Sequence, residues 1–376
     1  MPSKSLKKQI NRGMKTDFDS VVFYTTMTLV FFGIIMVFSA SYIQSSFKHN
    51  DPYFFLKRDL IYATLGFIGM IILSKVDYKL WKKYATPICI IAIVFLLLVL
   101  TPLGIEANGA KRWLGVGGAT FQPSDIAKFA CVVFTAKLIE KRYDKIKSLT
   151  KGVLPILIMP MIIFILIMLE PNMSTAGTVV LVIFVMLFVA GMNMKFVGAM
   201  GLGGMGLFAI LVLMEPYRLK RITSFLDPFQ DPLGSGYQVI QSLYALGSGG
   251  LFGLGLGKSK QKYLYIPEPQ NDFIFAIIGE ELGLIGCILV ILLFILLVYR
   301  CVRIALKCED IFGCMLVIGI GSLIGIQAAL NIAVATSTMP NTGVALPFIS
   351  YGGTSLTMLM GEIGIVLNIS KSVKIN

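Results

Sequence analysis

The strongest constraint on this 376-residue chain is a series of apolar runs, many of them long enough to cross the roughly 30 Å hydrocarbon core of a lipid bilayer. Charged residues make up only 14% of the chain, which is too few to cover the surface of a soluble domain of this size. We therefore predict an all-α polytopic membrane protein with about ten transmembrane helices. The expected spans are 21–43, 59–73, 84–101, 124–138, 153–169, 175–191, 196–214, 273–298, 311–336 and 351–369.

The basic residues lie mainly at the ends of the apolar runs, which is typical of topology signals. Most of the 33 Lys and Arg residues face the cytoplasm if the amino terminus is inside, so both termini are predicted to be cytoplasmic. Topology and anionic membrane lipids then account for the net charge of +13, and no nucleic-acid binding is expected. We divide the chain into an N-terminal tail (1–20), a transmembrane domain (21–370) and a C-terminal tail (371–376).

Two outer loops are long enough to suggest a function. The first covers 102–123, and the second is the large extracellular loop 215–272 between the seventh and eighth expected helices. Within the second loop, apolar residues recur on one helical face between 236 and 246, which predicts a short amphipathic helix at the membrane interface.

The cysteines and the histidine argue against two kinds of site. All six cysteines fall in expected helices or on the cytoplasmic side, so no disulfides are predicted. His49 is the only histidine and no two cysteines have the spacing of a metal-binding pair, so we expect no thiolate or imidazole metal site.

Carboxylates in or near a membrane are costly, so each one needs a physical reason. Asp272 directly precedes an expected helix and could be its N-cap, or a base held on a rigid element; the two roles are compatible. The other outer candidates are Glu170 and Glu268. Three deeper carboxylates could instead pair with neighbours inside the bundle: Glu280, Glu281 and Glu362.

Several cations lie beside these carboxylates. Asp125 and Lys128 are three residues apart at the start of an expected helix, where they could form a local ion pair or Lys128 could bind a phosphate. Lys111 and Arg112 belong to the first outer loop. An outward cluster of carboxylates and cations fits a sugar-phosphate enzyme, a lipid transporter or a receptor scaffold, and these residues alone leave the choice open.

A set of motifs, in this order and spacing, resembles the SEDS proteins (shape, elongation, division and sporulation) over almost the whole chain. The motifs are Phe38-Ser-Ala-Ser-Tyr42, Lys111-Arg-Trp-Leu114, Phe121-Gln-Pro-Ser-Asp-Ile-Ala-Lys128, Glu170-Pro-Asn-Met-Ser-Thr-Ala176, Pro267-Glu-Pro-Gln-Asn-Asp-Phe-Ile-Phe-Ala276, Gly279-Glu-Glu-Leu-Gly283 and Leu346-Pro-Phe-Ile-Ser-Tyr-Gly-Gly-Thr-Ser355. The first motif and the segment 261–268 look closer to the FtsW and SpoVE branch than to RodA.

The resemblance implies a peptidoglycan glycosyltransferase of the bacterial plasma membrane, at the division septum, with its active site facing outside. Its substrate would be lipid II, the undecaprenyl-pyrophosphate disaccharide-pentapeptide, and its partners a class B penicillin-binding protein (a transpeptidase) and other division proteins. The aspartate that matches Asp272 is regarded as catalytic in the family. Family members usually have His-Thr or Gln-Thr before this aspartate, where this chain has Gln270 and Asn271.

The expected chemistry assigns roles to the candidate residues. Asp272 would be the general base for the acceptor hydroxyl, a role worth roughly 10²–10⁴ in rate. Lys128 with Lys111 or Arg112 would balance the departing pyrophosphate, and Glu170 and Glu268 complete the substrate site. No cofactor is required, although a divalent metal such as Mg²⁺ could assist the pyrophosphate.

Two other functions remain open. A lipid II flippase needs a path through the bundle, which Glu280, Glu281 and Glu362 would mark. A non-catalytic division scaffold needs only partner binding.

Overall fold

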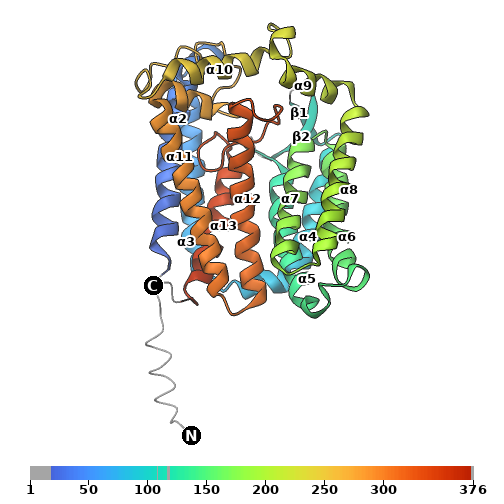
Figure 1. Ribbon diagram of the computed structural model, residues 1–376. Helices are drawn as coiled ribbons and strands as arrows, with labels where there is room; N and C mark the ends of the chain where they lie inside the picture. The colour runs from blue at the N-terminus through green and yellow to red at the C-terminus, as the bar shows by residue number, and fades with distance from the viewer. Residues whose placement is uncertain (1–17, 108, 117–118, 374–376) are drawn as a thin grey trace, which may run out of the picture.

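A computed structural model describes residues 18–107, 109–116 and 119–373 as a bundle of long helices (Figure 1). Every expected span overlaps one of these helices. Most of the predicted N-terminal tail and the last three residues lie outside the described residues. The ten long helices of the described chain are α2 (Ser20–His49), α3 (Phe54–Lys75), α4 (Lys79–Leu100), α5 (Pro123–Lys141), α6 (Leu154–Leu169), α7 (Met173–Val189), α8 (Met194–Leu213), α11 (Ile274–Lys307), α12 (Ile311–Ala335) and α13 (Thr354–Ser370).

The lengths and compositions of these helices fit a multi-pass membrane protein. Six segments of the described chain are long and apolar enough to cross a bilayer, and they contain α2, α4, α6, α8, α11 and α12. Helices α7 and α13 are apolar but shorter. Helices α3 and α5 carry charged residues, among them Asp59 and Lys128. How many helices cross the membrane stays a prediction.

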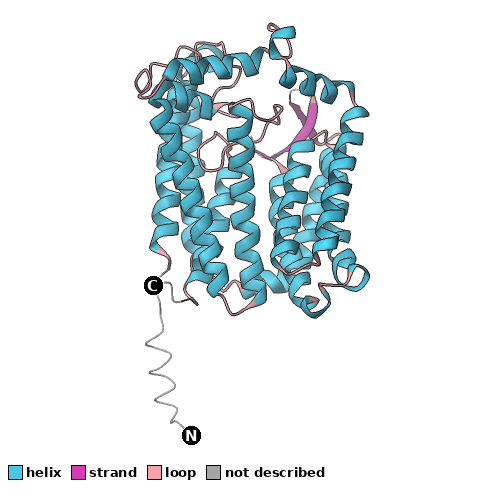
Figure 2. Cartoon of the chain, in the orientation of Figure 1, coloured by secondary structure: helices cyan, strands magenta, loops and turns pink. Residues whose placement is uncertain are grey.

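The bundle has two different ends (Figures 1 and 2). One end, called the sheet end here, carries β1 (Gly104–Ala107), β2 (Ala110–Val116), β3 (Ala119–Phe121), α9 (Pro216–Leu226) and α10 (Tyr237–Gly249). At the opposite end α2 begins and α13 finishes, and the Asp19 backbone N–H donates to Ser370 Oγ at 2.9 Å.

The sheet corrects the all-α prediction. Strands β1, β2 and β3 form an antiparallel sheet in chain order, built entirely from the loop between α4 and α5. Strand pairing gives a long connection partners for its backbone N–H and C=O groups, which a structureless loop would lack. Helix α9 was also not predicted, whereas α10 matches the expected amphipathic helix and buries Val239 and Ile240.

Helix α12 lies largely in the core, and most of its residues are buried. Helix α5 packs against both α12 and α4. Helix α8 is the opposite case, since Val212 is its one buried residue.

Helix α11 is broken at Gly283, where φ is +69°. Residues 250–255 occupy the break: the Leu254 backbone N–H donates to Glu280 O at 2.9 Å, and the Leu284 N–H donates to Gly250 O at 2.9 Å. A left-handed backbone conformation is readily adopted only by glycine, which explains the residue type at this position. The break attaches the long connection between α10 and α11 to the bundle.

Candidate functional site

Asp272 lies at the sheet end, two residues before α11 begins. The N-cap position of α11 is occupied by Phe273, and no side chain caps the helix, so Asp272 is not the N-cap. The carboxylate of Asp272 has no hydrogen-bond partner among the described residues. The capping role that the sequence left open is therefore removed, and the carboxylate is available for chemistry.

The main chain around Asp272 is firmly held. Asn331 Nδ2, on α12, donates to Asp272 O at 2.8 Å, and Ser350 Oγ donates to Asn271 O at 2.7 Å. The Tyr351 backbone N–H donates to Gln270 O at 2.9 Å. These contacts come from residues 59 to 81 positions further along the chain, and they fix the aspartate relative to the bundle.

Charges from three segments surround the carboxylate of Asp272. Burial, together with the nearby Glu268 carboxylate, raises the pKa of Asp272 to about 6, against the opposing effect of the Arg221 and Arg112 guanidinium groups. Arg221 belongs to α9 and Arg112 to β2. A carboxylate with a pKa close to neutral pH suits a general base, because it is ionised and still basic enough to accept a proton.

Glu268 is placed next to this site by the loop itself. Its φ of +48° turns the chain, and Asn271 Nδ2 donates to Glu268 Oε2 at 2.9 Å. Glu268 therefore already has a partner and acts on Asp272 through its charge.

Glu170 follows α6 and is joined to the site through Arg112. Arg112 Nε donates to Glu170 O at 3.3 Å, and its Nη2 donates to Pro171 O. The Glu170 carboxyl group is buried, and neither oxygen has a hydrogen-bond partner in the described chain. Burial raises the pKa of Glu170 to about 8, against the opposing effect of Arg112, so the group is mainly protonated at neutral pH.

Lys111 is exposed and lies opposite Glu106 in the register of β1 and β2. Successive side chains on a strand point to opposite faces, so Lys111 and Arg112 cannot both face Asp272. The structure brings Arg112 to the site and leaves Lys111 on the other face of the sheet.

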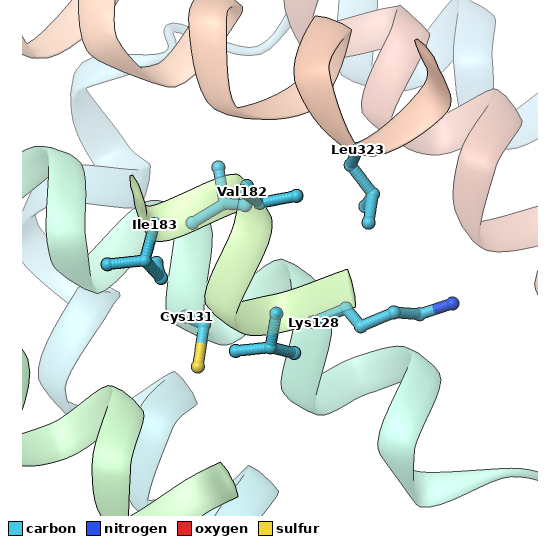
Figure 3. Close-up of a pocket in the computed structure, with 7 residues that line it drawn as sticks. Lys128, Cys131, Val182, Ile183 and Leu323 are labelled. Carbon is cyan, nitrogen blue, oxygen red and sulfur yellow. The ribbon is translucent and has the colours of Figure 1, made fainter. Parts of the chain in front are cut away.

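Lys128 lies inside the bundle, and its Nζ forms a buried ion pair with Asp125 Oδ1 at 2.8 Å. Glu362 of α13 is buried close enough for its charge to interact with this pair. Lys128 also borders a pocket of about 160 Å³ that is too narrow for a water molecule and is otherwise lined by uncharged side chains. Figure 3 shows its amine pointing away from Cys131 and Ile183 of that pocket. Lys128 is not among the charges that shift the pKa of Asp272.

The deep carboxylates Glu280 and Glu281 have structural partners. Glu281 Oε1 accepts from Lys262 Nζ at 2.9 Å, and Ser39 Oγ lies 2.7 Å from Oε2. Glu280 Oε1 accepts from the Lys260 backbone N–H at 2.8 Å. Both side chains attach the connection between α10 and α11 to the bundle, so neither is free to line a path for a lipid headgroup.

The sequence missed three parts of the site. Arg221 is one of the cations of the predicted outer loop 215–272, where nothing in the sequence singles it out, and Asn331 carries no signal beyond being a polar residue in an apolar helix. The segment 341–344, between α12 and α13, lies against Asp272 and has no motif that points to the site. A buried polar residue in a span, such as Asn331, is the signal that could have been used.

A metal ion has few candidate ligands here. Within the described residues, no group of three or more His, Cys, Asp or Glu side chains is arranged to hold a metal ion. All six cysteines are free thiols.

The fold and the site define a multi-pass membrane protein in which the carboxylate of Asp272, without a hydrogen-bond partner among the described residues, lies near the charges of two arginines at one end of the bundle. Residues 19–375 match the family described as cell cycle protein, which groups FtsW, RodA and SpoVE. The chain belongs to this family, the SEDS family, which confirms the resemblance of its motifs.

Relatives match over nearly their whole length. The chain is 46% identical to stage V sporulation protein E of Bacillus subtilis (strain 168), over 95% of this chain and 98% of the relative. It is 43% identical to a probable peptidoglycan glycosyltransferase FtsW of Geobacter sp. (strain M18), with the same coverage.

Solved structures agree. A chain from the structure described as "Structural coordination of polymerization and crosslinking by a peptidoglycan synthase complex" has a TM-score of 0.76 and 29% identity, over 94% of this chain and 97% of the other. The crystal structure of the rod shape determining protein RodA of Thermus thermophilus has a TM-score of 0.70 and 27% identity, over 96% and 98%.

Proposed function

We propose that this protein is a peptidoglycan glycosyltransferase that polymerises lipid II for division or sporulation septum synthesis, with Asp272 as the general base. The names of its relatives support the reaction class. The single observation that carries the residue assignment is the carboxylate of Asp272, which has no hydrogen-bond partner in the described chain and has a pKa raised to about 6.

The reaction is one displacement. The 4-hydroxyl of the acceptor sugar attacks the anomeric carbon of the donor, its proton passes to Asp272, and the bond from that carbon to the pyrophosphate breaks. An α-linked donor then gives a β-1,4-linked product with inversion, so one base suffices and no covalent intermediate is needed.

The departing pyrophosphate requires positive charge. Arg112 and Arg221 are the cations that act on Asp272, so we assign them the phosphate groups nearest to the base. Lys128 would act from deeper in the bundle, and Lys111 from the far face of the sheet. Glu170, being mainly protonated, would donate a hydrogen bond to the substrate. A divalent ion such as Mg²⁺ would supply further positive charge to the pyrophosphate if it were bound with the substrate.

The sheet end should face outside, where lipid II presents its sugars, and both termini should be cytoplasmic. The charge distribution supports this orientation because the connection 142–153 at the opposite end is rich in Lys and Arg. A cysteine placed at Lys145 should resist a membrane-impermeant thiol reagent in intact cells, since that position would be inside. Labelling of that cysteine without permeabilisation would overturn the topology.

A class B penicillin-binding protein is the proposed partner, and a groove on the surface of the bundle offers it a docking place. The groove lies between α11 and α12 and has a volume of about 640 Å³. Its floor of small residues suits a single apolar transmembrane helix. The lining includes Gly325, Ala328, Ala329, Ile291, Phe294 and Ile295.

The deciding experiment follows labelled lipid II on a gel with the purified protein and its transpeptidase partner. Glycan strands support the enzyme, and translocation of lipid II in vesicles without polymer would support a flippase. Partner binding with neither activity would leave a scaffold. The hydrogen bonds to Glu280 and Glu281 weigh against the flippase, because they occupy two of the three carboxylates that such a path would use.

A further inference from the structure

The segment 341–344 forms a wall beside Asp272, although it has no regular secondary structure. Gly343 is exposed and has a φ of +70°. A Cβ atom built on Gly343 would lie 3.4 Å from Asp272 Oδ2, and this oxygen is the one neighbouring atom that it would meet within 4 Å. The face of Gly343 therefore points to open space next to one oxygen of the candidate base.

Four elements hold this wall, three of them through its backbone carbonyl groups and one through the side chain of Asn341. Arg221 Nη1 of α9 donates to Asn341 O at 2.9 Å, and Ser174 Oγ of α7 donates to Thr342 O. Asn331 Nδ2 of α12 donates to Val344 O at 2.8 Å, while Gln238 Oε1 of α10 accepts from Asn341 Nδ2 at 2.8 Å.

One of these holding groups also fixes the base. The same amide nitrogen of Asn331 donates to Asp272 O at 2.8 Å and to Val344 O at 2.8 Å. Asn331, a buried side chain, therefore links the wall directly to the main chain of Asp272.

We infer that Gly343 and the wall 341–344 form the acceptor-sugar subsite of the glycosyl transfer proposed above. A hydroxyl must come within about 3 Å of the base that deprotonates it, and Asp272 Oδ2 is the carboxylate oxygen that faces the open side of Gly343. A pyranose ring lying against the backbone of Gly343 would present its hydroxyl to that oxygen. Any side chain at position 343 would occupy the same space.

Substitution of Gly343 tests this subsite. The test must separate two effects of a side chain: strain in the backbone at a positive φ, and filling of the space proposed for the acceptor sugar. Asn tolerates the left-handed conformation better than Ala, but its side chain is larger. If only strain matters, Gly343→Asn should be more active than Gly343→Ala. If the space is the acceptor subsite, Gly343→Asn should be at least as impaired as Gly343→Ala, with a loss of rate on the order of tenfold to a hundredfold.

Gly191 provides the matched control. It is exposed, has a φ of +89°, and a Cβ there would meet nothing within 4 Å. Gly191 lies in the connection between α7 and α8, at the end of the bundle opposite the sheet end. Gly191→Asn and Gly191→Ala should therefore polymerise labelled lipid II at the wild-type rate.

The measurements are the rate of polymerisation by the full-length protein with its partner, the melting temperature, and the retention of labelled lipid II. Gly343→Asn should match Gly191→Asn in melting temperature and still retain lipid II as donor, yet polymerise slowly. A Gly343→Asn protein that polymerises like Gly191→Asn overturns the subsite, as does one that is more active than Gly343→Ala.

Asp272→Asn in the same assay separates the two proposals. If Asp272→Asn is inactive while Gly343→Asn is normal, only the subsite is wrong. If the wild-type protein makes no polymer with its partner, the proposed function fails and the subsite fails with it.

Discussion

Asp272 and Glu281 lie nine residues apart around the same end of α11, yet the structure treats their carboxylates in opposite ways. Glu281 is fully buried and has Lys262, Ser39 and the Ser259 backbone N–H as partners. Asp272 is half-buried, and its carboxylate has no hydrogen-bond partner among the described residues. Both lie close to cations, so proximity to positive charge does not distinguish them.

The difference separates a carboxylate proposed to act on the substrate from one with a structural role. A buried charge must be paired and hydrogen-bonded, and Glu281 meets that requirement entirely within the protein. Asp272 is held by its main chain while its side chain stays unbonded, and this arrangement keeps the oxygens available for a substrate. An acidic residue near a membrane therefore indicates a function only after its partners are known.

The largest expected effect is that of Asp272→Asn on the rate. Asn cannot accept the hydroxyl proton, so glycan synthesis should slow at least about a hundredfold. The variant should fold, insert and bind its partner, because Asp272 makes its structural contact through its main-chain oxygen. Gel analysis of labelled lipid II measures the rate, and normal polymerisation by a folded variant would make Glu268 the next candidate for the base.

Glu281→Gln should act on folding rather than on the rate: its main effect should be loss of folded protein. It leaves the buried ammonium group of Lys262 without a charged partner, which typically costs roughly 3–5 kcal/mol. The double variant Glu281→Leu with Lys262→Met should recover much of the melting temperature, since apolar replacement of a buried pair is often neutral.

Asp51→Asn is the matched control for this pair. It breaks the exposed ion pair between Asp51 and Lys57, so it should leave the melting temperature unchanged. If the Glu281→Gln protein is as stable as the Asp51→Asn protein, the buried pair does not hold the connection between α10 and α11. Glu281 would then not be a structural carboxylate, and the contrast with Asp272 would be wrong.

The apolar runs predicted the bundle, but they could not predict its ends. Helix positions follow from hydrophobic length and local propensity, which are visible in sequence, and α10 followed from the periodicity of its apolar face. The sheet β1–β3 is three short strands, and its pairing depends on a loop between two helices rather than on apolar length. The break at Gly283 depends on residues 250–255, which lie some thirty positions earlier.

The residues of the candidate site likewise fall into those that the sequence identifies and those that only the fold reveals. Asp272 could be identified because its motif is local, and Arg112 because it is a cation in a long loop. Arg221 and Asn331 act through contacts with residues 341 and 272, so only the fold reveals them. Lys262 belongs to the loop 215–272, which is predicted to lie outside, yet its side chain is buried because it pairs with Glu281 of α11.

Lys128 is an intermediate case between the two carboxylates compared above, because it is paired with Asp125 and is also proposed to act on the substrate. Lys128→Ala should weaken lipid II use more than it lowers folded yield. The double variant Lys128→Met with Asp125→Asn removes the buried charge imbalance, so it should fold normally and still polymerise more slowly than wild type. If the double variant restores the wild-type rate as well as the yield, Lys128 is only a structural partner of Asp125.

The smallest effect should come from Glu268→Gln. This variant tests whether a neighbouring charge changes the pKa of Asp272, as expected for a carboxylate without a hydrogen-bond partner. Asp272 must be ionised to accept a proton, so the rate should rise with pH with a midpoint at about 6 and level off at higher pH. The Glu268 carboxylate raises the pKa of Asp272, so removing its charge should move the midpoint of this profile to lower pH.

The Gln side chain keeps an oxygen that can accept the hydrogen bond from Asn271 Nδ2, so the loop should stay in place. The expected outcome is therefore a wild-type plateau rate, an unchanged melting temperature and a midpoint shifted downward by less than about one pH unit, as for a single half-exposed neighbouring charge. The profile is measured with the full-length protein and its partner, using Glu106→Gln on β1 as a control that removes a carboxylate not among the charges acting on Asp272. A midpoint that stays fixed, or that rises, would mean that the titrating group in the rate profile is not Asp272. A base with no partner inside the protein should respond to its neighbours in this way, whereas a carboxylate bonded like Glu281 would not set the profile at all.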